Sequence, residues 1–275
     1  MKKLLSITLA VCLLASCLFT LTSCKKTLIV YTESGFAPFE YVSGGKIVGV
    51  DVDIMELVGE KLGKKVKFVD TDFDSIVPAV KEGKLTNVGA AGISITEARK
   101  KDVDFSKEYY TASLYVIYLA DEAEAYESDT TDGVTGVYWD SLKGKKIAVQ
   151  NGTTADLFLG DELAEGGTLA GSDATKVGYS KLATAVEDVQ KQLQSNVLII
   201  DELPAKKLIE GKSSLKCAPL YYQGGENEAD EAATDSYAIC VTKGQDDLLK
   251  AINEVLDELG EEGIQKLVDK HLLGE

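Results

Sequence analysis

The chain has 275 residues, and its 45 acidic and 29 basic side chains give a formal net charge of −16 at pH 7. This acidity argues against nucleic acid as a partner, because phosphates are bound by basic patches. His271 is the single histidine, so we expect no His-rich metal site, no cofactor and no His-based catalysis. The length suffices for one large domain or for two lobes.

The first 23 residues have the features of a secretory signal peptide. A positive flank at residues 2–3 precedes an apolar run from residue 4 to about residue 21, and small residues follow before a boundary. A retained membrane anchor is the alternative, which the hydroxyl residues within the run weaken. Both interpretations place the rest of the chain outside the cytoplasm.

A lipid attachment site is predicted at Cys24. Residues 21–24, LTSC, resemble a bacterial lipobox, in which the cysteine is acylated after cleavage. Residues 14–17 also fit this pattern, but lysines follow Cys24 whereas apolar residues follow Cys17, so Cys24 is the better candidate. Cleavage before Cys24 leaves 252 residues (275 − 23), and the loss of two lysines takes the net charge to −18.

Two cysteines remain in the body of the chain, Cys217 and Cys240. They could pair in an oxidising compartment, but we expect two buried thiols. Neither has neighbours at a metal-ligand spacing.

Strands and helices alternate through the first part of the mature chain. Residues 27–31, TLIVY, predict a buried strand, and a loop at 33–40 breaks it. Asp51 and Asp53 place negative charge at the start of a helix, where it suits the helix dipole. A strand, a short helix and a strand of small residues follow at 65–69, 75–81 and 88–91.

A second series of strands and helices follows a long β-prone run at 109–120. Residues 121–132 carry six acidic groups and no basic one, which predicts a solvated loop. Further strands are predicted at 147–150, 197–200 and 237–241, helices near 151–154 and 182–193, and two helices at the end. Because the pattern occurs twice, each time with a long extended crossing, we predict two α/β lobes joined by crossing strands.

Arg99 is the single arginine of the chain and follows a stretch rich in small residues and hydroxyls at 92–97. Its guanidinium can bind a carboxylate bidentately, which a lysine cannot do, and Ser94 and Thr96 add donors beside it. The alternative is a surface arginine in a helix capped by Thr96. Residue type alone favours that alternative, and the surrounding chain argues against it.

Asp201 stands at the C-terminal end of the apolar run 197–200, which is typical of a parallel strand covered on both faces. In open α/β sheets, ligands bind beyond the carboxyl ends of the strands. The alternative is a plain helix cap, which would be the better interpretation for an isolated aspartate.

Several motifs then occur in order behind the lipobox: FAPFE at 36–40, GVDVDI at 49–54, GISITEARK at 92–100, VDFS at 103–106, LKGKKIAVQ at 142–150 and IDE at 200–202. In this order they closely resemble the family 3 solute-binding proteins of ABC importers, the polar amino acid group, from Leu28 almost to the end. The resemblance implies an α/β periplasmic-binding-protein type II fold with a hinge of two crossing strands near 111–112 and 235–236. Lobe 1 would comprise residues 24–111 and 236–275, and lobe 2 residues 112–235.

The resemblance also implies which residues bind the two charges of an amino acid. Arg99 would hold the α-carboxylate, helped by Ser94 and by backbone N–H groups near Gly92. Asp201 would take the α-ammonium. Burying both charges costs several kcal/mol per ion unless each is paired. Because Arg99 and Asp201 belong to different lobes, pairing favours the closed state.

The remaining site residues are assigned by the same resemblance. Thr153 and Thr154 would offer N–H groups at a helix N-terminus, which favours an anion. Phe36 and Phe73 would flank the side chain of the ligand, and Glu33 would contact its distal end.

Glu33 predicts a ligand with a cationic or hydrogen-bond-donating side chain. A carboxylate in a closed cleft is too costly to leave unpaired, and lysine, arginine or ornithine would pair it, while glutamine or cystine would donate hydrogen bonds. The alternative is that Glu33 turns outward to Lys46 or to solvent.

The resemblance therefore implies a monomeric receptor, anchored by lipid at Cys24 outside the cytoplasm, that captures a free polar amino acid by lobe closure. It would deliver this amino acid to the permease of an ABC transporter and would not be an enzyme. A dehydratase-like enzyme on the same fold, with Glu33 as general acid, is one alternative. An amino-acid sensing module is another, which we disfavour because we expect no signalling domain after residue 275.

Overall fold

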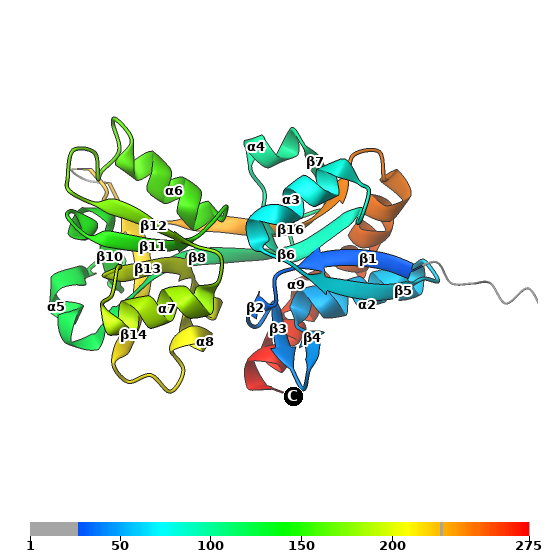
Figure 1. Ribbon diagram of the computed structural model, residues 1–275, viewed down its shortest axis with the longest axis horizontal. Helices are drawn as coiled ribbons and strands as arrows, with labels where there is room; N and C mark the ends of the chain where they lie inside the picture. The colour runs from blue at the N-terminus through cyan, green and yellow to red at the C-terminus, as the bar shows by residue number, and fades with distance from the viewer. Residues whose placement is uncertain (1–26, 226–227, 275) are drawn as a thin grey trace, which may run out of the picture.

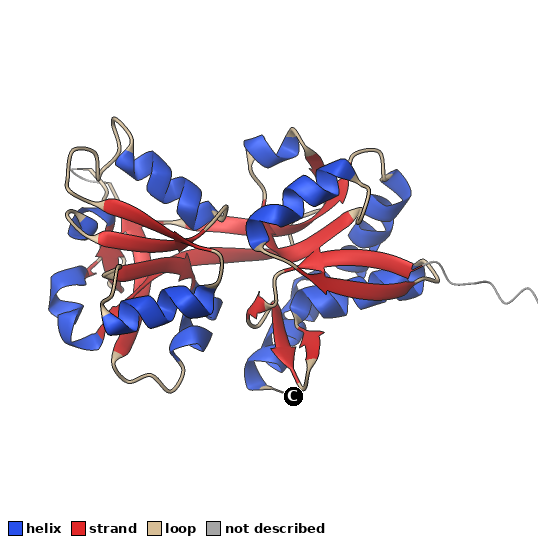
Figure 2. Cartoon of the chain, in the orientation of Figure 1, coloured by secondary structure: helices blue, strands red, loops and turns tan. Residues whose placement is uncertain are grey.

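The computed structural model describes residues 27–225 and 228–274, which form two α/β lobes side by side (Figure 1). The predicted signal peptide and Cys24 lie outside the described residues. In each lobe helices flank a sheet (Figure 2). One continuous strand order, β12-β11-β13-β8-β16-β6-β1-β5, runs through both lobes.

The sheet of the first lobe is built on β1 (Thr27–Thr32), which lies parallel to β5 (Lys65–Asp70) and to β6 (Val88–Ser94). The short strand β7 (Val103–Phe105) pairs with β16 (Thr234–Thr242). A three-stranded sheet of β2 (Gly35–Phe36), β3 (Glu40–Ser43) and β4 (Lys46–Val48) follows β1. The helices of this lobe are α2 (Val50–Lys61), α3 (Phe73–Glu82), α4 (Glu97–Lys100) and α9 (Asp246–Leu273).

The sheet of the second lobe contains β11 (Lys146–Gln150), which lies parallel to β12 (Thr175–Tyr179) and β13 (Val197–Asp201). Beside it, β14 (Leu215–Tyr222) pairs with β10 (Thr135–Tyr138) and β15 (Glu231–Ala232), and β10 pairs with β9 (Glu127–Asp129). The helical segments are η1 (Ala120–Glu122), α5 (Ala123–Tyr126), η2 (Trp139–Leu142), α6 (Thr154–Leu163), α7 (Leu182–Lys191) and α8 (Glu202–Ile209).

Two long strands connect the lobes, β8 (Tyr110–Leu119) and β16 (Figure 1). They pair antiparallel where Ala112 faces Asp235 and Thr111 faces Ser236. Beyond this crossing, β8 pairs with β13 and β14, whereas β16 pairs with β6 and β7. The predicted lobe boundaries and the use of this crossing as a hinge both stay predictions.

Strand β6 runs from the hydrophobic core of the first lobe to the cleft between the lobes. All of its residues are buried, and most are small. A Cβ at Gly89 would lie 2.5 Å from Ile76 Cγ2 and 2.8 Å from Cys240 Sγ, so a larger residue would push α3 and β16 away. After Ser94 the chain turns into α4, where Thr96 is the N-cap and accepts a hydrogen bond from the backbone N–H of Arg99 (3.1 Å).

Residues 121–132, expected as a loop, contain η1, α5 and β9, so this prediction was wrong. The cause is tertiary packing. Tyr126 is buried in the core of the second lobe beside Tyr118, whose hydroxyl donates to Glu127 (2.5 Å). Aromatic burial therefore orders a segment that its charge alone would leave in water.

The chain ends in α9, whose backbone is interrupted at Gly260 (φ 57°, ψ −177°). This break agrees with the prediction of two final helices, and His271 lies in the last turn as expected. Cys217 is half-buried and Cys240 buried, and neither is in a disulfide. Within residues 27–225 and 228–274, no helix is long and apolar enough to cross a membrane, and no cluster of ligating side chains could hold a metal ion.

Candidate functional site

A small cavity lies between the lobes, beyond the carboxyl ends of β1, β6, β11 and β13. Its volume is about 10 Å³, close to the minimum that one water molecule needs. The two lobes therefore contact each other directly across the cleft, and a larger guest requires them to separate. The cavity is lined by Glu33, Phe36, Phe73, Gly92, Ser94, Gln150, Thr153, Thr154 and Asp201.

Eight of these lining residues are among the predicted ligand contacts, and Gln150 is the addition. Arg99, the ninth predicted contact, lies directly behind Ser94. Its guanidinium donates to Ser94 O (2.5 Å) and to Gly152 O (2.7 Å) and stands 5.6 Å from the centre of the Phe73 ring. Only 9% of Arg99 is exposed, so the alternative of a surface arginine is wrong, although Thr96 does cap its helix.

Arg99 is buried close to the negative charge of Asp235. Burial lowers the pKa of Arg99, and the nearby negative charge of Asp235 opposes this effect. Its two hydrogen bonds go to backbone carbonyl groups, one in each lobe. A carboxylate placed here would be a stronger partner than a neutral carbonyl, because a bidentate Arg–carboxylate pair is charge-assisted.

Opposite Arg99, the N-terminus of α6 faces the cavity. Thr153 is the N-cap residue, and its hydroxyl accepts from Asp156 N (3.3 Å) and donates to Gln150 O (2.8 Å). Thr154 begins the helix and turns its hydroxyl toward Ser94 Oγ at 3.3 Å. A guanidinium, two hydroxyls and a helix N-terminus thus converge on one point, which is a suitable environment for a carboxylate.

Asp201 lies at the end of β13 and occupies the N-cap position of α8 without making a side-chain cap. The alternative of a plain helix cap is therefore wrong. Asp201 is buried, and its Oδ1 atom has no hydrogen-bond partner. Burial raises the pKa of Asp201 well above its ordinary value, and the negative charge of Asp235 raises it further. A cation beside this carboxylate would supply the missing partner and restore its charge.

Asp235 is a site residue that the sequence interpretation placed only in the hinge. Its Oδ2 atom accepts from Ser94 Oγ (2.7 Å) and from Thr154 Oγ1, while Oδ1 is buried without a partner. Burial also raises the pKa of Asp235. No motif pointed to this residue, because its position depends on the pairing of β16 with β8 and on closure of the second lobe over it.

Gly92 and Phe36 form the wall on the side of the first lobe. Gly92 has φ +53°, and a Cβ there would lie 2.9 Å from Phe36 Cε1, so both the backbone conformation and the space require glycine. The N–H of Gly92 donates to Asp51 Oδ2 (2.9 Å), and Tyr109 OH donates to Asp51 Oδ1 (2.5 Å). The buried Asp51 thus fixes the backbone of Gly92 from below.

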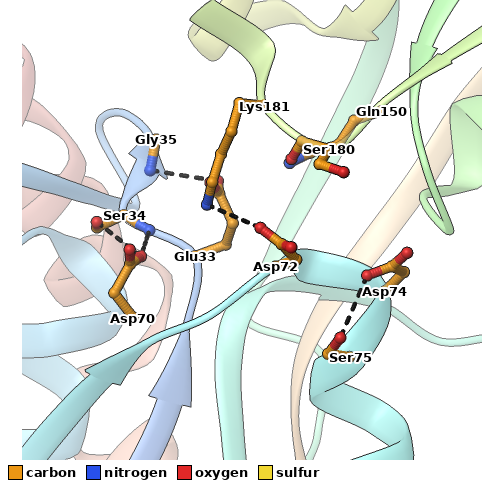
Figure 3. A network of polar contacts seen from close by, with 10 residues as sticks. All are labelled: Glu33, Ser34, Gly35, Asp70, Asp72, Asp74, Ser75, Gln150, Ser180 and Lys181. Carbon is orange, nitrogen blue, oxygen red and sulfur yellow. Dashed lines mark hydrogen bonds and ion pairs between the residues drawn. The ribbon is translucent and has the colours of Figure 1, made fainter.

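Glu33 closes the far end of the cavity. It is almost fully buried, so the alternative that it turns outward to Lys46 or solvent is wrong. Its Oε2 accepts from Gly35 N (3.2 Å), and its Oε1 accepts from Lys181 Nζ (2.8 Å), a residue of the second lobe (Figure 3). Lys181 was not expected at the site.

The comparisons with known proteins agree with this architecture. The sequence model of the bacterial extracellular solute-binding proteins, family 3, matches residues 28–274. The chain belongs to this family. The expected resemblance is thereby confirmed. The family consists of binding proteins, so the expectation that the chain is not an enzyme is confirmed as well.

Three relatives illustrate the similarity of this solute-binding protein to proteins with named ligands. The Arginine-binding extracellular protein ArtP of Bacillus subtilis is 27% identical, with 100% of both chains covered. The Histidine-binding periplasmic protein of Escherichia coli is 26% identical over 98% of this chain and 97% of its own. A crystal structure of the amino acid ABC transporter substrate-binding protein AbpA of Streptococcus pneumoniae, bound to L-arginine, superposes with a TM-score of 0.73. It is 26% identical and covers 90% of this chain and 95% of its own. The periplasmic-binding-protein type II fold is therefore confirmed.

Proposed function

We propose that this protein captures a free amino acid with a cationic side chain and delivers it to the permease of an ABC transporter. One observation carries the proposal: Asp201 and Glu33 line one inter-lobe cavity, and Arg99 lies directly behind its lining residue Ser94. An amino acid of this class carries one anionic and two cationic groups. The site offers Arg99 for the anion and Asp201 and Glu33 for the cations, with Asp235 as a further buried carboxylate that acts on Asp201.

The α-carboxylate of the ligand would replace the carbonyl groups now bound by Arg99. It would also accept from N–H groups at the start of α6, and from the hydroxyls of Ser94 and Thr154 once these turn away from Asp235, to which they donate in the closed protein. The α-ammonium would bind Asp201, whose buried Oδ1 atom has no partner in the closed protein. Each buried charge would then have a partner of opposite sign, which is the condition for burial without a net cost.

The side chain of the ligand would pass between Phe36 and Phe73 to reach Glu33, and all three residues line the cavity. Two aromatic rings suit an alkyl stem or a planar guanidinium, and each ring face attracts a cation. The named ligands of the relatives, arginine and histidine, support a basic amino acid over cystine. Glutamine remains the neutral comparison ligand.

Calorimetric titration with all twenty amino acids, ornithine and cystine tests the proposal. We expect arginine, lysine or ornithine to bind most tightly and to raise the melting temperature, because a ligand that binds only the folded state stabilises it. Tightest binding of an acidic or a purely aliphatic amino acid would contradict the proposed role of Glu33. No binding of any amino acid would contradict the proposed function itself.

We propose further that the protein is a monomer held at the outer face of the cell membrane by a lipid on Cys24. The motif at 21–24 supports this, and two acyl chains give stable anchoring where one is marginal. Mass spectrometry of the membrane fraction should find a lipid-modified Cys24 at the N-terminus. A released protein that starts at another residue without lipid would contradict the anchor and leave amino acid capture untouched.

A further inference from the structure

Lys181 forms an ion-pair network with Glu33, at the far end of the cavity, and with Asp72 (Figure 3). It precedes α7 in the second lobe, and its Nζ atom lies 2.8 Å from Glu33 Oε1 and 3.4 Å from Asp72 Oδ1. Both carboxylates belong to the first lobe. Within residues 27–225 and 228–274, these are the ion pairs that join the two lobes as divided above, and Lys181 makes both.

The two carboxylates that pair with Lys181 differ in their exposure to solvent, and therefore in how costly the loss of this cation would be. The side chain of Glu33 is 3% exposed, whereas that of Asp72 is 52% exposed and that of Lys181 is 43% exposed. A buried carboxylate without a cation is strongly disfavoured, but an exposed one is solvated by water. Asp72 also makes no cap to α3, so its carboxylate is free to hold a cation.

The positions of Glu33 and Lys181 are fixed by their neighbours. The N–H and hydroxyl of Ser34 both donate to Asp70 Oδ1, at 2.7 and 2.8 Å, which holds the loop that carries Glu33. On the other lobe, Gln150 Nε2 donates to Ser180 O at 3.2 Å, which holds the backbone before Lys181 (Figure 3). Lobe closure therefore brings Glu33 and Lys181 within reach of each other, and the flexible lysine stem allows the ion pair to form.

The charges at this end of the cavity leave room for one more cation. Glu33 and Asp72 carry two negative charges against the single positive charge of Lys181. Burial lowers the pKa of Lys181, but the hydrogen bond and charge of Glu33 outweigh this and keep it charged, so it competes with any other cation for Glu33. A ligand cation at Glu33 would give each of these two carboxylates a cation of its own, with Lys181 kept on Asp72, and the negative charge of Asp70 lies nearby.

We propose that Lys181 determines the side-chain selectivity of the site by occupying Glu33 until a cationic ligand takes its place. The inference rests on the proposed function and deepens it. With a cationic amino acid, the ligand pairs with Glu33, and Lys181 remains on Asp72 as the ionic contact between the lobes. With a neutral amino acid, Lys181 stays paired with Glu33, so the buried carboxylate keeps a cationic partner. Lys181 thus lowers the preference of the site for cationic over neutral ligands.

Calorimetric titration of arginine and glutamine into the wild type and Lys181→Gln tests the inference. We expect the ratio of arginine to glutamine affinity to rise about tenfold in Lys181→Gln, which is the size of one charge-assisted hydrogen bond. The ratio is the readout because the lost contact with Asp72 weakens closure around both ligands alike. Lys181→Arg should keep the wild-type ratio, since it restores the cation.

Two further variants separate this role from a general effect of charge. Lys191→Gln removes an exposed lysine at the end of α7, the helix that Lys181 precedes, and should leave the ratio unchanged because the partner of Lys191, Glu187, lies on the same helix. In Glu33→Gln, adding Lys181→Gln should no longer change the ratio, because the residue for which the two cations compete is gone. Melting temperatures confirm that each variant is folded.

The outcomes distinguish the inference from the function on which it rests. A wild type that binds arginine, with an unchanged ratio in Lys181→Gln, overturns the inference alone. An equal effect of Lys181→Gln in the presence and absence of Glu33 overturns it as well. A wild type that binds no amino acid overturns both.

Discussion

Arg99 and Gly152 are joined across the cleft by a hydrogen bond of 2.7 Å from the guanidinium Nη2 atom to the carbonyl oxygen. The same guanidinium reaches Ser94 O in its own lobe. One side chain therefore ties the backbone of both lobes together at the point where we place the α-carboxylate of the ligand. The fork geometry of arginine makes this double contact possible.

Arg99→Lys should leave the protein folded and weaken amino acid binding by on the order of tenfold or more, because the bidentate fork is lost while the charge is kept. Calorimetry gives the affinity, and the melting temperature reports folding. An unchanged affinity would remove Arg99 from the binding site.

Gly92→Ala should reduce both stability and affinity, because it adds a Cβ at φ +53° that would lie 2.9 Å from Phe36 Cε1. The matched control is Gly44→Ala, at φ +57° with nothing within 4 Å of the new Cβ. We expect backbone strain to lower the free energy of unfolding of each variant by about 1–2 kcal/mol, and the contact with Phe36 to lower that of Gly92→Ala further. Only Gly92→Ala should also weaken ligand binding. Equal affinities in the two variants would show that the wall formed by Phe36 and Gly92 does not contact the ligand.

Asp235→Asn should show how much the charge of Asp235 affects Asp201, the other buried carboxylate of the site. The amide oxygen still accepts from Ser94 and Thr154, but the negative charge that raises the pKa of Asp201 is gone. We expect the unliganded protein to be as stable as the wild type or more so at pH 7, and the affinity for the ligand ammonium to fall by about tenfold. Urea unfolding and calorimetry measure the two effects. A loss of stability with unchanged affinity would instead make Asp235 a structural residue of the crossing strands.

The free energy of unfolding of the unliganded protein should fall as the pH rises from about 4 to about 6. Burial raises the pKa of Asp51 from 3.8 to about 6, despite hydrogen bonds from Tyr109 and Gly92 that lower it. The folded state thus prefers the protonated carboxyl. The contribution of Asp51 to the free energy of unfolding is complete below its pKa in the unfolded chain and is lost as the pH rises through its pKa in the folded protein. A rise from 3.8 to about 6 corresponds to roughly 3 kcal/mol.

Burial also raises the pKa values of Glu40, Asp201 and Asp235, so these groups add to the same trend. Asp230, whose pKa is lowered to about 2 chiefly by the Tyr138 hydroxyl, acts in the opposite direction only below about pH 4. Urea unfolding as a function of pH measures the sum. Saturating ligand should remove the contribution of Asp201 by pairing it and leave that of Asp51, so the curve becomes shallower. A stability that rises steadily from pH 4 to 6 without ligand would contradict this account.

The parts of the fold and site that follow from short-range sequence patterns could be predicted. Periodicity and apolar runs placed the strands around Val30 and Ile199, and the order of motifs led to Arg99 and Asp201. The structure brings both of these residues to the inter-lobe cavity, and their binding roles await the tests above. These residues sit at strand ends or helix starts, where local sequence decides position.

The residues that the sequence did not reveal depend on contacts between the lobes. Lys181 resembles any other helix-start lysine until closure places Glu33 within 2.8 Å of it. Asp235 is one of many acids in its region, and only the pairing of β16 with β8 brings it to Ser94. Tyr126 likewise orders an acidic segment through burial, a tertiary effect that charge counting does not include.

The pairing of β6 with β16 has a consequence for how the chain acquires its structure. Ser94 lies opposite Tyr237, and Val88 lies opposite Val241, so the first sheet receives a neighbouring strand from a segment synthesised long after it. Until that segment emerges, the edge of β6 is unpaired and its apolar face uncovered, whereas the second lobe is one continuous stretch. We therefore expect the first lobe to complete its sheet only when the last quarter of the chain has been made, whereas the second lobe can form its sheet from one uninterrupted segment.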